Sequence, residues 1–261
     1  MIWNNFHFFS KVLDIQTEAY VLLPEYPDIQ QLHGEPLPTL YLLHGLSDDY
    51  TGWMRWTRIE AYARKYALAV VMPAVNRSFY TDMAHGAKYW TFISEELPAI
   101  METYFPLSTK REGRFAAGLS MGGYGAMKLG LARPERYAAV AALSAPLMMQ
   151  EIYGKPFNLH EEWDREMDAV FGDEASFRAR NGDLTLLADR LDPKDAPRIY
   201  AACGTADFLY QANETFMAKY AKKLNIHYET KPEASHTWDF WDEQIQKVLE
   251  WLPLQKLENV W

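Results

Sequence analysis

The sequence predicts an α/β fold: a mostly parallel central sheet with helices on both faces and an antiparallel N-terminal edge. Short apolar runs, such as Thr39–Leu43, alternate with stretches of helical spacing. Strands that are apolar throughout are typical of a parallel sheet buried on both faces. The segments 5–10 and 18–23, by contrast, follow one another without an intervening helix. They are therefore expected to form the antiparallel edge.

The expected elements follow in chain order. Pro24 ends the second strand, and the proline-rich stretch 25–38 is expected to be a loop. Glu95 and Glu96 begin a helical stretch, where the helix dipole favours acidic residues. The predicted strands are 5–10, 18–23, 39–43, 68–72, 114–118, 137–143 and 198–203, with one more around His227. The predicted helices are 53–66, 94–104 and the segment that follows the strand 114–118 and ends at Ala132.

Length and composition indicate one globular domain over residues 1–261. The chain is 49% hydrophobic and 23% charged, which excludes a disordered or fibrous protein. The alternation breaks between Ala145 and Pro197, so a helical cap insertion is expected at about 146–197. The net charge is -9, and the sequence contains no basic stripe. Both observations disfavour a nucleic-acid partner. The sequence leaves open whether the chain forms a homo-oligomer.

Nothing in the sequence points to a membrane or an export signal. The start lacks a basic segment followed by an apolar one, and no run of about 18 apolar residues occurs. Cys203 is the single cysteine, so no intrachain disulfide can form. We therefore expect a cytoplasmic protein without membrane contact.

A G-x-S-x-G segment, Gly118-Leu119-Ser120-Met121-Gly122, lies between an expected strand and an expected helix. A nucleophile elbow requires that context. So tight a turn leaves no room for side chains two residues before or after the serine, and it strains the serine backbone. Ser120 is therefore the candidate nucleophile.

Two later loops supply a base and an acid for Ser120. His236 lies between the last expected strand and the final helix, and Asp207 follows the strand 198–203. In this architecture the nucleophile, acid and base follow in that order. Asp207 would hold the imidazole tautomer and stabilise the imidazolium. Other candidate acids precede that strand and belong at its opposite end: Asp183, Asp189, Asp192 and Asp195.

Backbone N–H groups are expected to form an oxyanion hole. Met121 follows the nucleophile, and Leu46 follows His44-Gly45 at the end of the strand 39–43. Their N–H groups would stabilise the negative oxygen of a tetrahedral intermediate. His44 itself is expected to hydrogen-bond the loop.

These residues resemble the esterase D branch of the α/β hydrolases, which includes S-formylglutathione hydrolases and tributyrin-type esterases. The resemblance covers nearly the whole chain and implies an α/β-hydrolase fold with Ser120, Asp207 and His236 as nucleophile, acid and base. Ala234-Ser235 departs from the relatives, where a glycine is common. The matching segments are 41–45, 71–73, 95–98, 118–125, 204–210 and 236–241.

Aromatic residues beside strand-end loops are candidates for substrate binding. Trp53, Trp90 and Trp238 are expected to contact the substrate. Met148, Met149 and Trp163 of the insertion are candidates for a cap over the site. No His, Cys or Asp spacing resembles a zinc site, and the chemistry needs no cofactor.

The predicted function is hydrolysis of short-chain acyl esters, small molecules, by a serine carboxylesterase through an acyl-enzyme. Within the same class, an S-formylglutathione hydrolase is the first alternative, followed by an acetylated-sugar or cinnamoyl esterase. An acyltransferase would share every motif, since only the acceptor differs. A non-catalytic binding module would be expected to have lost part of the triad.

Overall fold

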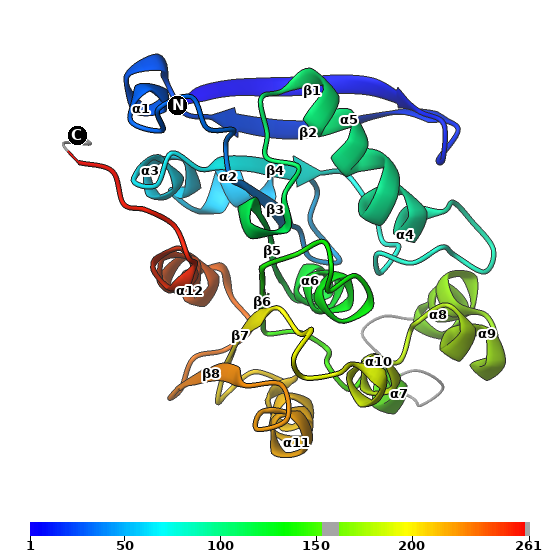
Figure 1. Ribbon diagram of the computed structural model, residues 1–261. Coiled ribbons are helices and arrows are strands. Elements are labelled where there is room, and N and C mark those ends of the chain that lie inside the picture. The colour runs from blue at the N-terminus through cyan, green and yellow to red at the C-terminus, as the bar shows by residue number, and fades with distance from the viewer. Residues whose placement is uncertain (153–161, 259–261) are drawn as a thin grey trace.

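The computed structural model describes residues 1–152 and 162–258, and in them one eight-stranded sheet runs in the order β1-β2-β4-β3-β5-β6-β7-β8 (Figure 1). β1 pairs with β2, and β2 with β4, in antiparallel fashion, while the other neighbours are parallel. The predicted parallel sheet with an antiparallel N-terminal edge is confirmed. The strands are β1 (Ile2–Ser10), β2 (Ile15–Leu23), β3 (Thr39–Leu43), β4 (Ala69–Pro73), β5 (Arg114–Leu119), β6 (Ala139–Leu143), β7 (Arg198–Gly204) and β8 (Ile226–Lys231).

The helices depart from the sequence expectation at three places. The helix expected over 94–104 begins earlier, at Tyr89, and includes a π-helix, so Glu95 and Glu96 lie inside the helical stretch and not in its first turn. The loop expected over 25–38 holds a short helix, whose first turn tolerates a proline because no backbone N–H is needed there. The helix expected over 53–66 is two helices, because Thr57 is extended and its Oγ1 donates to Trp53 O and accepts from Ile59 N. The helices are α1 (Tyr26–Gln30), α2 (Gly52–Trp56), α3 (Ile59–Arg64), α4 (Tyr89–Thr91), the π-helix η1 (Phe92–Glu96), α5 (Leu97–Tyr104), the 3₁₀-helix η2 (Arg111–Gly113), α6 (Met121–Ala132), α7 (Met149–Ile152), α8 (Trp163–Phe171), α9 (Glu174–Ala179), α10 (Leu184–Arg190), α11 (Tyr210–Tyr220) and α12 (Trp238–Trp251).

Side chains of each central strand alternate between two hydrophobic layers, one on each face of the sheet. In β3, Leu40 and Leu42 enter the layer that α2, α3 and α12 cover. Tyr41 and Leu43 enter the layer under α5, α6 and α11. Figure 1 shows α3 and α12 on one side of the sheet and α5 and α6 on the other. This double cover explains why β3, β4, β5 and β6 are buried at every position and are mostly apolar.

The segment between β6 and β7 contains α7 to α10 in the residues that the structure describes. It corresponds to the insertion expected at about 146–197, of which residues 153–161 lie outside the described residues. Figure 1 shows α8 and α9 beyond α6, away from the sheet. No helix in the described parts of the chain is long and apolar enough to cross a membrane.

Candidate active site

Ser120 stands at a strained turn between β5 and α6. Its backbone has φ 51° and ψ -120°, and its N–H donates to Leu143 O at 2.8 Å. A Cβ on Gly118 would overlap the backbone of Gly122, and one on Gly122 would overlap Leu43 O. Only glycine fits at these two positions. A positive φ at a residue other than glycine is strained, and here it places the serine at the N-terminus of a helix.

Asp207 and His236 meet at the carboxyl end of the neighbouring strands. Asp207 Oδ2 lies 2.9 Å from His236 Nδ1, and its Oδ1 accepts from Leu209 N at 2.9 Å. The Asp207 side chain is fully buried and that of His236 is one-fifth exposed. Because the carboxylate accepts from Nδ1, the Nε2 atom of a neutral ring is left as the basic nitrogen.

Two loops are joined directly where they carry the acid and the base. Ala206 N–H donates to Ala234 O at 2.9 Å, and Glu233 N–H donates to Thr205 Oγ1 at 2.9 Å. A Cβ on Gly204 would overlap Ala234 O. The loop can therefore approach β7 closely without the glycine that relatives often have at position 234 or 235.

Ser120 opens onto a small apolar cavity of about 30 Å³. Phe208 lines this cavity, and its ring centre lies 4.6 Å from that of His236. Phe208 thus links the Asp207–His236 pair to the cavity that Ser120 lines. The lining residues are Leu46, Phe79, Ser120, Met121, Pro146, Met149, Ile152, Trp163, Phe208 and Leu209.

The two expected oxyanion-hole residues, Leu46 and Met121, line the same cavity as Ser120. Met121 is the first residue of α6. An N-terminal helix end presents free N–H groups and a positive dipole, both suited to a developing anion. The arrangement is therefore capable of stabilising an oxyanion next to Ser120.

His44 fixes the loop that leads to Leu46. Val75 N–H donates to its Nε2 at 3.3 Å, so Nδ1 carries the proton and donates to Gly45 O at 2.8 Å. Burial lowers the pKa of His44, in keeping with a neutral ring. Tyr80 Oη donates to His44 O at 2.9 Å. The loop after β4 thus holds the loop after β3 in place.

The three tryptophans expected at the substrate lie outside this cavity in the part of the chain that the structure describes. Trp53 has no exposed surface, and its Nε1 donates to Leu43 O, so it offers no face to a substrate. Trp90 lies beneath Lys128 Nζ, which is 4.9 Å from the centre of its ring. Trp238 packs on Trp241, which in turn contacts His236.

The structure also places the candidate cap residues and Cys203. Met149 and Trp163 line the cavity, whereas Met148 does not. Cys203 is buried in β7, and burial raises the pKa of its thiol, which disfavours a thiolate nucleophile. In residues 1–152 and 162–258 no group of three His, Cys, Asp or Glu side chains is placed to hold a metal ion.

Sequence reasoning missed Phe79 and Phe208 as cavity walls. A signal for both existed in the sequence. Phe208 follows the expected acid directly, and Phe79 lies in the loop after β4, at the end of the sheet where ligands bind.

Comparisons with known proteins place the chain among esterases. The Esterase family model matches residues 10–252. The chain is 34% identical over 256 residues to an acetyl esterase of Caldicellulosiruptor saccharolyticus, covering 94% of this chain and 96% of that protein.

Two solved structures from Staphylococcus aureus each cover 96% of this chain and 98% of their own. The fluorophosphonate-binding serine hydrolase FphF has a TM-score of 0.85 at 33% identity. The S-formylglutathione hydrolase FrmB has a TM-score of 0.82 at 34% identity. These matches confirm the resemblance to the esterase D branch and favour an enzyme over a binding module. The chain belongs to the Esterase family, and it is a serine esterase with the α/β-hydrolase fold.

Proposed function

We propose that the enzyme hydrolyses esters of short acyl groups, acetyl to butyryl, through an acyl-enzyme on Ser120. The observation that supports this most strongly is the cavity of about 30 Å³ beside Ser120. A water-sized group needs roughly 10–15 Å³ on this scale, so about two such groups fit beyond the serine. Acetyl and propionyl chains match that space, butyryl is near its limit, and a cinnamoyl group exceeds it.

In the proposed reaction His236 Nε2 takes the proton of Ser120 Oγ as that oxygen attacks the acyl carbon. Asp207 holds the ring through Nδ1 and stabilises the imidazolium. The N–H groups of Leu46 and Met121 donate to the oxyanion, and each such donor is worth about 3–4 kcal/mol in the transition state. The alcohol leaves with the proton from His236, and a water that the same histidine activates releases the acid.

A series of p-nitrophenyl esters from acetate to decanoate tests this function, with Ser120→Ala as control. We expect the highest kcat/KM for acetate to butyrate and a steep fall beyond, because longer chains meet Trp163 and Phe79. Flat turnover across the series, or turnover by Ser120→Ala, would contradict the proposal.

S-formylglutathione hydrolysis is the second candidate. A formyl group is the smallest acyl group and fits the cavity, and FrmB carries that activity in its name. S-formylglutathione is therefore measured beside the esters. A large preference for the thioester would transfer the assignment to thioester hydrolysis while leaving the same acyl-enzyme chemistry in place.

We infer in addition that the described parts of the segment 146–197 form a cap, because Met149 and Trp163 close the cavity beside Ser120. A cytoplasmic location and a homo-oligomer stay predictions. Cell fractionation tests the first, and light scattering of the purified chain tests the second.

A further inference from the structure

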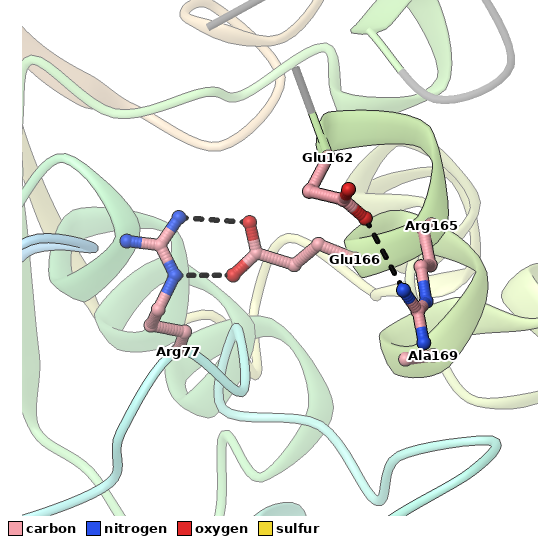
Figure 2. A pocket seen from close by; sticks show the side chains of 5 residues that line it. All are labelled: Arg77, Glu162, Arg165, Glu166 and Ala169. Atoms are coloured by element: carbon pink, nitrogen blue, oxygen red, sulfur yellow. Dashed lines mark hydrogen bonds and ion pairs between the residues drawn. The ribbon is translucent and has the colours of Figure 1, made fainter. Parts of the chain in front are cut away.

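Arg77 and Glu166 lie face to face between the loop after β4 and helix α8 (Figure 2). Arg77 Nη2 donates to Glu166 Oε2 at 2.8 Å, and Arg77 Nε donates to the other oxygen, Oε1. The Glu166 side chain is only 16% exposed. Two parallel bonds between a guanidinium and a carboxylate fix the direction as well as the distance between the groups.

Arg77 also holds the loop that carries the proposed oxyanion donor. Its Nη1 donates to Leu46 O at 3.2 Å, and Leu46 lines the cavity beside Ser120. One guanidinium therefore contacts both Leu46 and Glu166. If the Arg77 side chain moved, both Leu46 and Glu166 would lose the hydrogen bonds that hold them in place.

Glu166 lies one helical turn after Trp163, which closes the Ser120 cavity. Residues three apart lie on neighbouring parts of a helix surface, so the position of Glu166 governs the turn that carries the indole. The Trp163 ring is buried and meets Phe79 edge to face, with ring centres 6.3 Å apart.

The far end of α8 is held independently. Ala84 N–H donates to Val170 O, and His85 N–H donates to Ala169 O, each at 2.9 Å. Loss of the Arg77–Glu166 pair would therefore loosen the first turns of α8 while its last turn stays attached.

We propose that the Arg77–Glu166 pair sets the acyl-chain limit of the enzyme by holding Leu46 and Trp163 as walls of the Ser120 cavity. Arg77 and Glu166 are then positioning residues. The proposal rests on the proposed function and names what limits its substrates. In so small a cavity, an outward movement of Trp163 that makes room for the two methylenes by which hexanoyl exceeds butyryl would raise the turnover of the hexanoate.

Three variants test the proposal: Glu166→Gln, Arg77→Met and, as matched control, Arg165→Met. Arg165 lies on the same helix and pairs with Glu162 in an exposed ion pair, in which the arginine side chain is 86% exposed (Figure 2). The control thus removes an arginine and an ion pair of α8 that do not contact Leu46. The readouts are kcat and KM for p-nitrophenyl acetate, butyrate and hexanoate.

We expect the hexanoate-to-acetate ratio of kcat/KM to rise about tenfold in Glu166→Gln and Arg77→Met, the lower range for one methylene. Arg165→Met keeps the wild-type ratio. Arg77→Met additionally lowers kcat on acetate, because Leu46 loses its hydrogen bond, whereas Glu166→Gln retains that bond.

An unchanged ratio in both Arg77→Met and Glu166→Gln overturns the proposal, as does an equal loss on all three esters, which is the mark of a merely structural role. Glutamine matches the shape of glutamate, so Glu166→Gln keeps the test available if Arg77→Met does not fold. Failure of the proposed function is separate: wild type and Arg165→Met would then hydrolyse none of the esters, or all three equally well.

Discussion

Lys128 is an ionisable residue in the hydrophobic interior, on the helix that begins after Ser120. It has no exposed surface, and its Nζ donates to Thr81 Oγ1 at 2.8 Å and to Tyr80 O at 3.3 Å. The Trp90 ring lies 4.9 Å from Nζ. Burial lowers the pKa of Lys128 from 10.5 to about 7, although Asp82 opposes this shift.

The size of the effect follows from the two pKa values. Because the unfolded chain binds the proton more tightly, the free energy of unfolding rises with pH between about 7 and 10.5. This contribution to stability is fully present above the pKa of the unfolded chain, and it is lost as the pH falls toward about 7, the pKa in the folded protein. Each pKa unit is worth about 1.4 kcal/mol, so the full shift corresponds to about 5 kcal/mol. About 3–4 kcal/mol of it falls between pH 7 and 10.

Urea unfolding of wild type and Lys128→Met at pH 7, 8.5 and 10 measures this contribution. Methionine retains the length and helix propensity of lysine but does not titrate. The difference in the free energy of unfolding between wild type and Lys128→Met should change by about 3–4 kcal/mol across this pH range. In the control, Lys222→Met at an exposed position, the difference from wild type should stay constant with pH. Parallel pH profiles for wild type and Lys128→Met would refute the reasoning, since Lys128 would then stay charged in the fold.

Three further predictions concern the site. Asp207→Asn should lower kcat about 10⁴-fold at nearly unchanged stability, because the amide disturbs the His236 tautomer; kinetics and urea unfolding together check this, and a small fall in kcat would count against the pair. Gly122→Ala should destabilise the fold by at least about 4 kcal/mol, since its Cβ would overlap Leu43 O; a variant with wild-type stability would show that the elbow can relax. Burial lowers the pKa of His44, so the free energy of unfolding should decrease as the pH falls below about 6.5, where the unfolded chain takes up the proton first; His44→Gln should lack that decrease, and urea unfolding at pH 7 and 5 checks it.

The sheet and the places of Ser120, Asp207 and His236 at strand ends were predictable because their signals are local. Apolar strands, the glycines around Ser120 and the positions of Asp207 and His236 after successive strands all reflect backbone geometry that the sequence encodes directly. The break between α2 and α3 was not predictable, because it depends on a hydroxyl of Thr57 that bonds in two directions.

Contacts between distant segments could not be derived in the same way. Arg77 and Glu166 are 89 positions apart and occupy no motif, so only the folded chain shows that they pair. The expectation for Trp53 failed to account for burial on the second face of the sheet, where the indole completes the core. Strand-end position therefore predicts a site residue only when the side chain also points out of the core.

Labelling with a fluorophosphonate followed by peptide mapping tests the central claim, that Ser120 is the nucleophile activated by His236, most directly. Such a reagent forms a stable adduct with an activated serine, so no acyl-enzyme needs to accumulate. We predict one adduct on the peptide that contains Ser120, none in Ser120→Ala and a greatly slowed reaction in His236→Ala. An adduct on another residue, or labelling of Ser120 at the wild-type rate without His236, would contradict the account.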